Sequence, residues 1–147
     1  MDKKLFHQHL LIRAYVKNPP TKEEVLNDWL SSLVDAIKMK IVVPPRSAYV
    51  SKLGNEGLTG SVNIETSHCA IHIWDKLEIP RIEMDVYSCD CFELETVLNK
   101  LREFGLIKYH YMMVDRNHIP FEVVGEGGAL EDANYLNENE IKSSDLY

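Results

Sequence analysis

The chain has few cysteines, no long apolar run and no cluster of basic residues, and each shortage excludes a class of protein. Its three cysteines, Cys69, Cys89 and Cys91, are an odd number, which argues against a disulfide framework. The Cys89-x-Cys91 spacing differs from the CxxC of zinc and redox sites, so we expect no metal site. No apolar segment approaches the roughly 20 residues that span a bilayer. The N-terminus lacks the apolar core of a signal peptide, so we expect a cytoplasmic protein without membrane association.

Most of the net charge of −7 comes from the C-terminal end of the sequence. Residues 125–147 contain one base, Lys142, and six acids, Glu126, Glu131, Asp132, Glu138, Glu140 and Asp145. The rest of the chain has no basic stripe of the kind that binds nucleic acid. Such an acidic tail is more typical of a solvated segment than of a binding site. We therefore divide the chain into one domain, residues 1–124, and an acidic tail, residues 125–147.

Hydrophobic periodicity predicts two helices and a set of short strands. One helix is expected from a capping box at Thr21 to about Lys40, because its apolar residues recur every three or four positions. The second is expected between an N-cap pattern at Asp90 and Gly105. The predicted strands cover residues 5–16, 41–43, 58–65, 68–74, 81–88, 107–115 and 120–124. Pro44-Pro45 is expected to end the second of these strands, and residues 46–57 to form a loop.

The order of these elements predicts the fold class. The strands are joined by tight connections, which favour an antiparallel sheet with both helices on one face. This is an α+β fold with two layers. Alternation in residues 68–74 places His68 and His72 on the side opposite Cys69. The sheet face away from the helices is expected to carry the Ser67–His72 region and to need a cover such as a partner subunit.

Several short segments together resemble the signature of the small, prokaryotic-type S-adenosylmethionine decarboxylase proenzymes. A Ser-His pair is by itself usually structural, but its neighbours match the family at the family's spacing. The resemblance covers roughly residues 7 to 116. The matching segments are His9-Leu10-Leu11, Gly57-Leu58-Thr59-Gly60, Thr66-Ser67-His68, Ala70-Ile71-His72-Ile73-Trp74 and Met84-Asp85-Val86-Tyr87-Ser88-Cys89.

The resemblance implies a decarboxylase that makes its own cofactor. Decarboxylating an amino acid requires an electron sink, and this family forms a pyruvoyl group from a serine instead of using pyridoxal phosphate. Ser67 would be the precursor, through self-cleavage between Thr66 and Ser67. The implied substrate is S-adenosylmethionine, for polyamine (spermidine) synthesis, and family members usually work as homodimers.

The resemblance also assigns roles to other side chains. His72 matches the histidine that supports the elimination step of processing, and Thr59 matches a hydroxyl residue needed for it. Cys89 matches the proton donor that restores a proton to the substrate after carbon dioxide leaves. Trp74 and Tyr87 are possible contacts for the sulfonium cation by position, although core packing is the commoner role of such aromatics.

Three departures keep other functions open. The family usually has Glu where this chain has Thr66, Gly where it has Asp90, and an H-R-F-like segment that is absent near Arg46. One alternative is a homologue that does not process and that binds a ligand or partner. A second alternative is a pyruvoyl-dependent decarboxylase of another amino acid.

Overall fold

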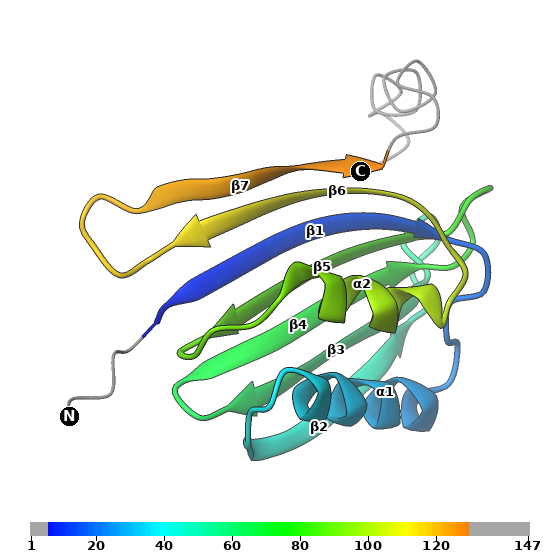
Figure 1. Cartoon of the computed structure of the whole chain (residues 1–147). Helices are drawn as coiled ribbons and strands as arrows, with labels where there is room; N and C mark the ends of the chain where they lie inside the picture. The colour runs from blue at the N-terminus through cyan, green and yellow to red at the C-terminus, as the bar shows by residue number, and fades with distance from the viewer. Residues whose placement is uncertain (1–5, 130–147) are drawn as a thin grey trace.

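The computed structural model describes residues 6–129, which form a seven-stranded antiparallel sheet with two helices on one face (Figure 1). The strands follow the order β2-β3-β4-β5-β1-β6-β7 across the sheet. This architecture confirms the predicted two-layer α+β fold. The elements are β1 (Gln8–Val16), α1 (Glu23–Ala36), β2 (Ile41–Val50), β3 (Gly57–Ile64), β4 (Ser67–Trp74), β5 (Arg81–Ser88), α2 (Leu94–Arg102), β6 (Leu106–Asp115) and β7 (Glu122–Ala129).

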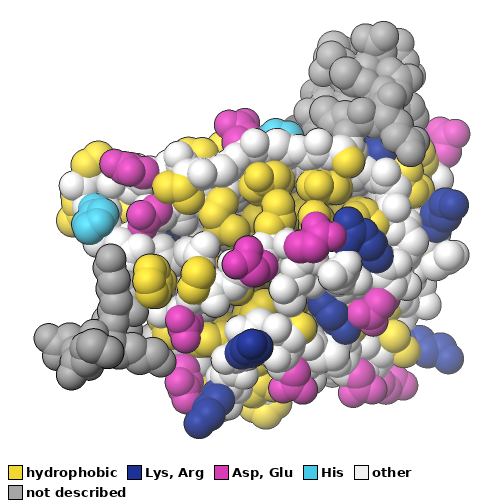
Figure 2. Space-filling model, in the orientation of Figure 1, with side chains coloured by type: hydrophobic (Ala, Val, Ile, Leu, Met, Phe, Trp, Pro, Cys, Tyr) yellow, Lys and Arg dark blue, Asp and Glu magenta, His cyan; other side chains and the backbone are white. Residues whose placement is uncertain are grey.

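The core lies between the helices and one face of the sheet. Alternate residues of the strands point toward the helices, and α1 packs against β2 and β3 while α2 packs against β1. Figure 2 shows hydrophobic side chains gathered above α2 in this view, over β1 and β6, where no helix covers the sheet. The largest fully buried side chains are Leu10, Ile12, Leu26, Leu30, Leu33, Leu58, Ile71, Ile82, Leu98, Leu101, Val16 and Val34.

The ends of α1 differ from the prediction. The capping position is Lys22 rather than Thr21, and its side chain makes no capping hydrogen bond. Two glutamates in the first turn, Glu23 and Glu24, instead complement the helix dipole. The helix ends at Ala36, not near Lys40, because Lys38 adopts a φ of 59° and turns the backbone away. The N–H groups of residues 38 and 39 close the end on the carbonyls of residues 35 and 34.

The second strand is much longer than expected. The predicted stop at Pro44-Pro45 is wrong, because β2 continues to Val50. The predicted loop over residues 46–57 is therefore wrong for residues 46–50, whereas residues 51–56 do connect β2 to β3 without strand structure. It is an edge strand, paired only with β3. Proline has no N–H to donate, and an edge strand tolerates it because one side of the strand has no partner to receive a hydrogen bond. Register shifts on both sides of Val43 absorb the irregularity.

The start of α2 also differs from the prediction. Helix α2 begins at Leu94 with Glu93 at the capping position, so the predicted N-cap at Asp90 is wrong; that carboxylate accepts the N–H of Cys91 instead. Gly105 has a φ of 74°, as expected for a residue just after a helix.

Strand β7 extends to Ala129, beyond the predicted end at Val124. It therefore includes the first residues of the segment predicted as an acidic tail. Glycine is required at Gly128, because a Cβ there would lie 2.1 Å from the carbonyl oxygen of Tyr109 on the neighbouring strand. The prediction for residues 130–147 lies outside the described part of the chain.

Neither described helix combines the length and apolar character that crossing a membrane requires.

Candidate functional site

The predicted site residues divide between the end of one hairpin and the face of the sheet opposite the helices, here called the open face. The open face is polar because the strands alternate apolar and polar residues. Its side chains from β1, β3, β4 and β5 include His9, Arg13, Thr59, His68, His72, Glu83, Asp85 and Tyr87.

The β3–β4 hairpin places Ser67 directly after a strained residue. Ile64 pairs with Ser67 across the ladder, so Glu65 and Thr66 form the turn between them. Thr66 has a φ of 53°, in the left-handed region that β-branched residues rarely adopt. Its hydroxyl donates a hydrogen bond of 2.8 Å to the carbonyl of Glu65. Such strain costs on the order of 1–3 kcal/mol.

Ser67 and Cys89 meet at the same carbonyl. The Ser67 Oγ donates to the carbonyl oxygen of Glu65 at 2.9 Å, and the Cys89 Sγ lies 3.1 Å from that same oxygen. Ser67 is only 8% exposed, whereas Cys89 is half-buried just after β5. The fold therefore brings together the two residues to which the resemblance assigns the cofactor precursor and the proton donor.

Thr59 and His72 form a second pair, on β3 and β4 of the open face, near the β2 edge of the sheet. They are direct partners across the β3–β4 ladder, and the Thr59 Oγ1 lies 3.1 Å from the His72 Nδ1. A shallow hollow of about 340 Å³ surrounds this pair. Its lining residues are Arg46, Ser47, Ala48, Thr59, Gly60, Ser61, Ala70 and His72.

Within one chain, the Ser67–Cys89 pair and the Thr59–His72 pair lie far apart. His72 is five residues beyond Ser67 on the same strand, a distance of about 16 Å in an extended strand. The two residues also have opposite parity, so Ser67 shares its side of the strand with the buried Cys69 while His72 faces outward. The expectation that both lie on the face away from the helices is therefore wrong for Ser67. A reaction that uses both pairs needs more than one copy of the described chain.

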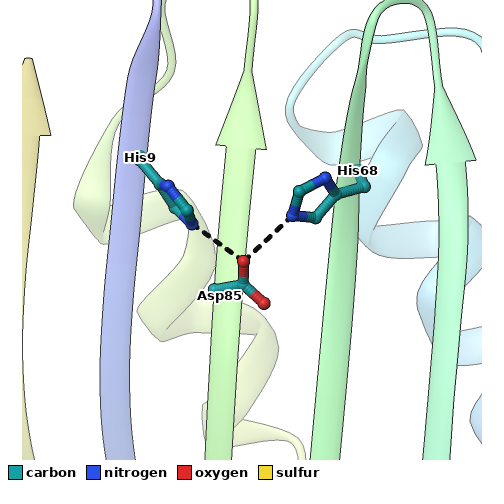
Figure 3. Close-up of side chains that lie close together, drawn as sticks. All are labelled: His9, His68 and Asp85. Carbon is teal, nitrogen blue, oxygen red and sulfur yellow. Dashed lines mark hydrogen bonds and ion pairs between the residues drawn. The ribbon is translucent and has the colours of Figure 1, made fainter. Parts of the chain in front are cut away.

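A third group of residues, which the sequence did not single out as a site, lies on the open face beside Ser67. Asp85 on β5 stands between His9 on β1 and His68 on β4, and both rings point toward it (Figure 3). The Asp85 Oδ2 lies 2.8 Å from the His9 Nε2 and 3.0 Å from the His68 Nε2. Burial alone would raise the pKa of Asp85, but hydrogen bonds and charge from the two histidines outweigh it and lower that pKa.

Arg116 extends this group on the His9 side. Its Nη1 lies 3.2 Å from the His9 Nδ1. Arginine can only donate, so the His9 Nδ1 must accept and the His9 Nε2 must carry the hydrogen given to Asp85. The three ligand atoms of His9, His68 and Asp85 lie within 4.8 Å of one another, which suits a metal ion by distance. The Arg116 contact leaves the His9 Nε2 without a lone pair to offer, so the group fits a hydrogen-bond network better than a metal centre.

The two aromatic residues considered for the sulfonium cation already contact cations of the chain. The Arg116 guanidinium lies 4.1 Å from the centre of the Tyr87 ring, which also stacks on His9. Arg81 lies 4.6 Å from the Trp74 ring centre. These contacts give both aromatics a packing role in the described chain.

The remaining thiol of the sheet is inert. Cys69 is fully buried under the helices, and this burial, helped by the negative charge of Asp85, raises the pKa of its thiol to about 12. It stays protonated and inaccessible, in contrast to the exposed Cys91.

The sequence indicated the Asp85 group only through the alternation of polar and apolar residues along each strand. His9, His68 and Asp85 each occupy the polar side of an alternating strand. That they lie side by side depends on the order β4-β5-β1, in which the first strand of the chain inserts beside the fifth. No local pattern in the sequence specified that insertion.

Comparison with known proteins gives one positive finding. The family model described as S-adenosylmethionine decarboxylase matches residues 8–117 of the 147-residue chain. A search of curated proteins finds no match. The matched residues include every side chain of the three groups described above.

Proposed function

The chain belongs to the S-adenosylmethionine decarboxylase family, and from this premise we propose that it decarboxylates S-adenosylmethionine with a pyruvoyl group made from Ser67. One observation carries the proposal most directly. A strained Thr66 precedes Ser67, and the hydroxyl of Ser67 shares the Glu65 carbonyl with the thiol of Cys89. The nucleophile Ser67 and the proton donor Cys89 thus lie beside the Thr66–Ser67 peptide bond, and breaking this bond would relieve the strain at Thr66.

The cleavage uses the side chain of Ser67. Its Oγ attacks the carbonyl carbon of Thr66, the amide nitrogen takes a proton and leaves, and the peptide bond becomes an ester. Loss of the α-proton of residue 67 then breaks the bond from Cβ to the ester oxygen. Residues 1–66 end in a carboxylate, and the new N-terminus at residue 67 gains water and releases ammonia. Relief of the left-handed Thr66 conformation favours the separation.

The residues present fit the group that this cleavage would create. Ser67 is nearly buried and has only the Glu65 carbonyl as its hydrogen-bond partner among residues 6–129, so its hydroxyl can rotate toward the Thr66 carbonyl. A pyruvoyl group supplies the electron sink that decarboxylation needs. Cys89 would hold the proton that returns to the substrate carbon, because its thiol can act as a proton donor.

The separation of the two pairs supports a homodimer. We propose that two copies meet open face to open face, so that Thr59 and His72 of one copy reach Ser67 and Cys89 of the other. The open face offers groups of both signs, such as Arg13 and Glu83, and the exposed apolar side chain of Leu11. The family's substrate would place the product in polyamine (spermidine) synthesis in the cytoplasm.

Intact mass under denaturing conditions tests the proposal. We expect two fragments in place of the 16.9 kDa chain, split between Thr66 and Ser67, with a pyruvoyl mass on the second. Ser67→Ala should give one uncut mass, and Ser51→Ala, which removes an exposed hydroxyl after β2, should cleave like the natural protein. A natural chain that stays uncut through long incubation contradicts the proposal.

Release of carbon dioxide then identifies the substrate. Cleaved protein should release it from S-adenosylmethionine and not from ornithine or arginine. Turnover of one of the other two amino acids would identify a decarboxylase with a different substrate. Persistent uncut chain, with no loss of biological effect in Ser67→Ala, would favour a homologue that binds a ligand or partner.

A further inference from the structure

After cleavage between Thr66 and Ser67, the pyruvoyl group at position 67 would remain bonded to His68. The two residues share a peptide bond, but their side chains have opposite parity on β4. The helix side of β4 is filled by the core, so a substrate can approach position 67 only from the open face or the hairpin end. The His68 ring lies on that open face, with 41% of its side chain exposed.

The network behind His68 holds its ring in one orientation. Arg116 donates to the His9 Nδ1, His9 donates through Nε2 to Asp85, and the His68 Nε2 donates to the same carboxylate oxygen. Edge contacts with the rings of His9 and Tyr87 limit rotation of the His68 ring further. The network thus leaves one ring atom, the His68 Nδ1, without a hydrogen-bond partner among residues 6–129.

We propose that His68 is a catalytic base that removes a proton from the α-ammonium group of the amino-acid substrate, with Asp85, His9 and Arg116 as positioning residues. The inference rests on the proposed function. An amino acid arrives mainly as an ammonium ion, which has no lone pair to react with a carbonyl. The N–H bond of the ammonium breaks, an N–H bond forms at the His68 Nδ1, and one positive charge moves to the ring. No electron transfer is involved.

The charges around His68 suit this transfer. Asp85 from β5 faces the ring directly, so the imidazolium that forms has a carboxylate counterion. Tyr87 from β5 and His9 from β1 supply ring contacts, and β3 presents the uncharged Asn63 at the paired position. The cation of Arg116 lies behind His9 and does not touch His68 in the described contacts. An Asp–His pair with one free nitrogen is the usual form of a general base.

The first test does not depend on activity. In uncleaved Ser67→Ala protein, the ring nitrogen signals of His68 are read by NMR and are assigned by their loss in His68→Gln. We expect the neutral ring to carry its hydrogen on Nε2, facing Asp85, and to keep a free lone pair on Nδ1. Adding Asp85→Leu removes the acceptor and should abolish this preference for one nitrogen, whereas His110→Gln, on the same face but paired with Glu126, should keep it. A hydrogen on Nδ1 in the Ser67→Ala protein, or the same preference in Asp85→Leu, would overturn the inference.

The second test uses cleaved protein. His68→Gln should lower kcat/KM for S-adenosylmethionine by about 100-fold or more and remove the acid limb of the pH profile. His110→Gln should keep the natural activity. A cleaved His68→Gln protein within threefold of the natural kcat/KM, with an unchanged profile, would also overturn the inference.

A third variant separates the possible failures. If His68→Gln does not self-cleave, the Asp85→Asn variant is used for the activity test instead. It keeps the His68 ring and should move the acid limb of the kcat/KM profile to lower pH. An acid limb that stays in place contradicts the role of His68. An uncut natural chain that releases no carbon dioxide marks failure of the proposed function itself.

Discussion

The two faces of the sheet are made from the same strands and have opposite compositions. In β4, Cys69, Ile71 and Ile73 point toward the helices and are at most 3% exposed. The residues between them point to the open face, and four of the six histidines of the chain lie on that face: His9, His68, His72 and His110. Alternation with a period of two thus gives one face the buried apolar side chains and the other face most of the polar and titratable ones.

Thiol labelling should show the largest difference between buried and exposed positions. With the pKa of Cys69 raised to about 12, only about one molecule in 10,000 carries its thiolate at pH 8. Maleimide should therefore label Cys91 more than about a thousandfold faster than Cys69 in the folded protein. Mass spectrometry of digested samples measures both rates. Comparable rates without denaturant would contradict the burial of β4 under the helices.

Neighbouring substitutions on β4 compare the faces directly. Ile71→Ala removes a fully buried side chain and should lower the free energy of unfolding by about 2–5 kcal/mol. His72→Ala removes an exposed ring and should change it by about 0.5 kcal/mol or less. Urea denaturation at fixed protein concentration, in the Ser67→Ala background, provides both values.

The same pair sharpens the division of roles. His72→Ala, introduced into otherwise natural protein, should block self-cleavage as seen by intact mass, even though it folds. Equal losses of stability for the two variants would contradict the difference between the two faces, and normal cleavage in His72→Ala would contradict the proposed role of His72 in processing.

Acid should weaken the open face first. Because the pKa of Asp85 is lowered in the folded state, its contribution is present above the pKa of an unfolded aspartate, near 4, and is lost as the pH falls through the lower folded value. Asp85→Asn should therefore cost about 1.5–3 kcal/mol at pH 7, the range for hydrogen bonds to a charged group. The difference from Asp85 should shrink below pH 4. Urea denaturation at a series of pH values measures it, and a constant difference would contradict the network.

The smallest effect is expected from the ion pair between Arg13 and Glu83 on the open face. Both side chains are 33% exposed, so water and salt screen their attraction. A double-mutant cycle with Arg13→Gln and Glu83→Gln should give a coupling of about 0.2–1 kcal/mol that falls in high salt. A coupling above about 2 kcal/mol would show that the open face excludes water more than the described chain does.

Local patterns predicted the elements that carry their own periodicity. The apolar spacing of α1 and the alternation of β4 and β5 were confirmed, because a helix or strand that buries one side must repeat at 3.6 or 2 residues. The wrong predictions concern element ends that depend on neighbouring parts of the structure. Pro44-Pro45 reads as a stop until its strand is known to be an edge, and α1 ends at a left-handed lysine where the sequence offers no glycine.

The sequence by itself determined the fold class, the family and the position of Ser67 before His68, because these depend on local order along the chain. Only the tertiary structure decided which of these residues meet. Cys89 reaches Ser67 through the shared Glu65 carbonyl, and Asp85 joins His9 to His68 because β1 pairs with β5. Such contacts join residues far apart in the chain, and strand order, which the packing of the whole sheet sets, decides them.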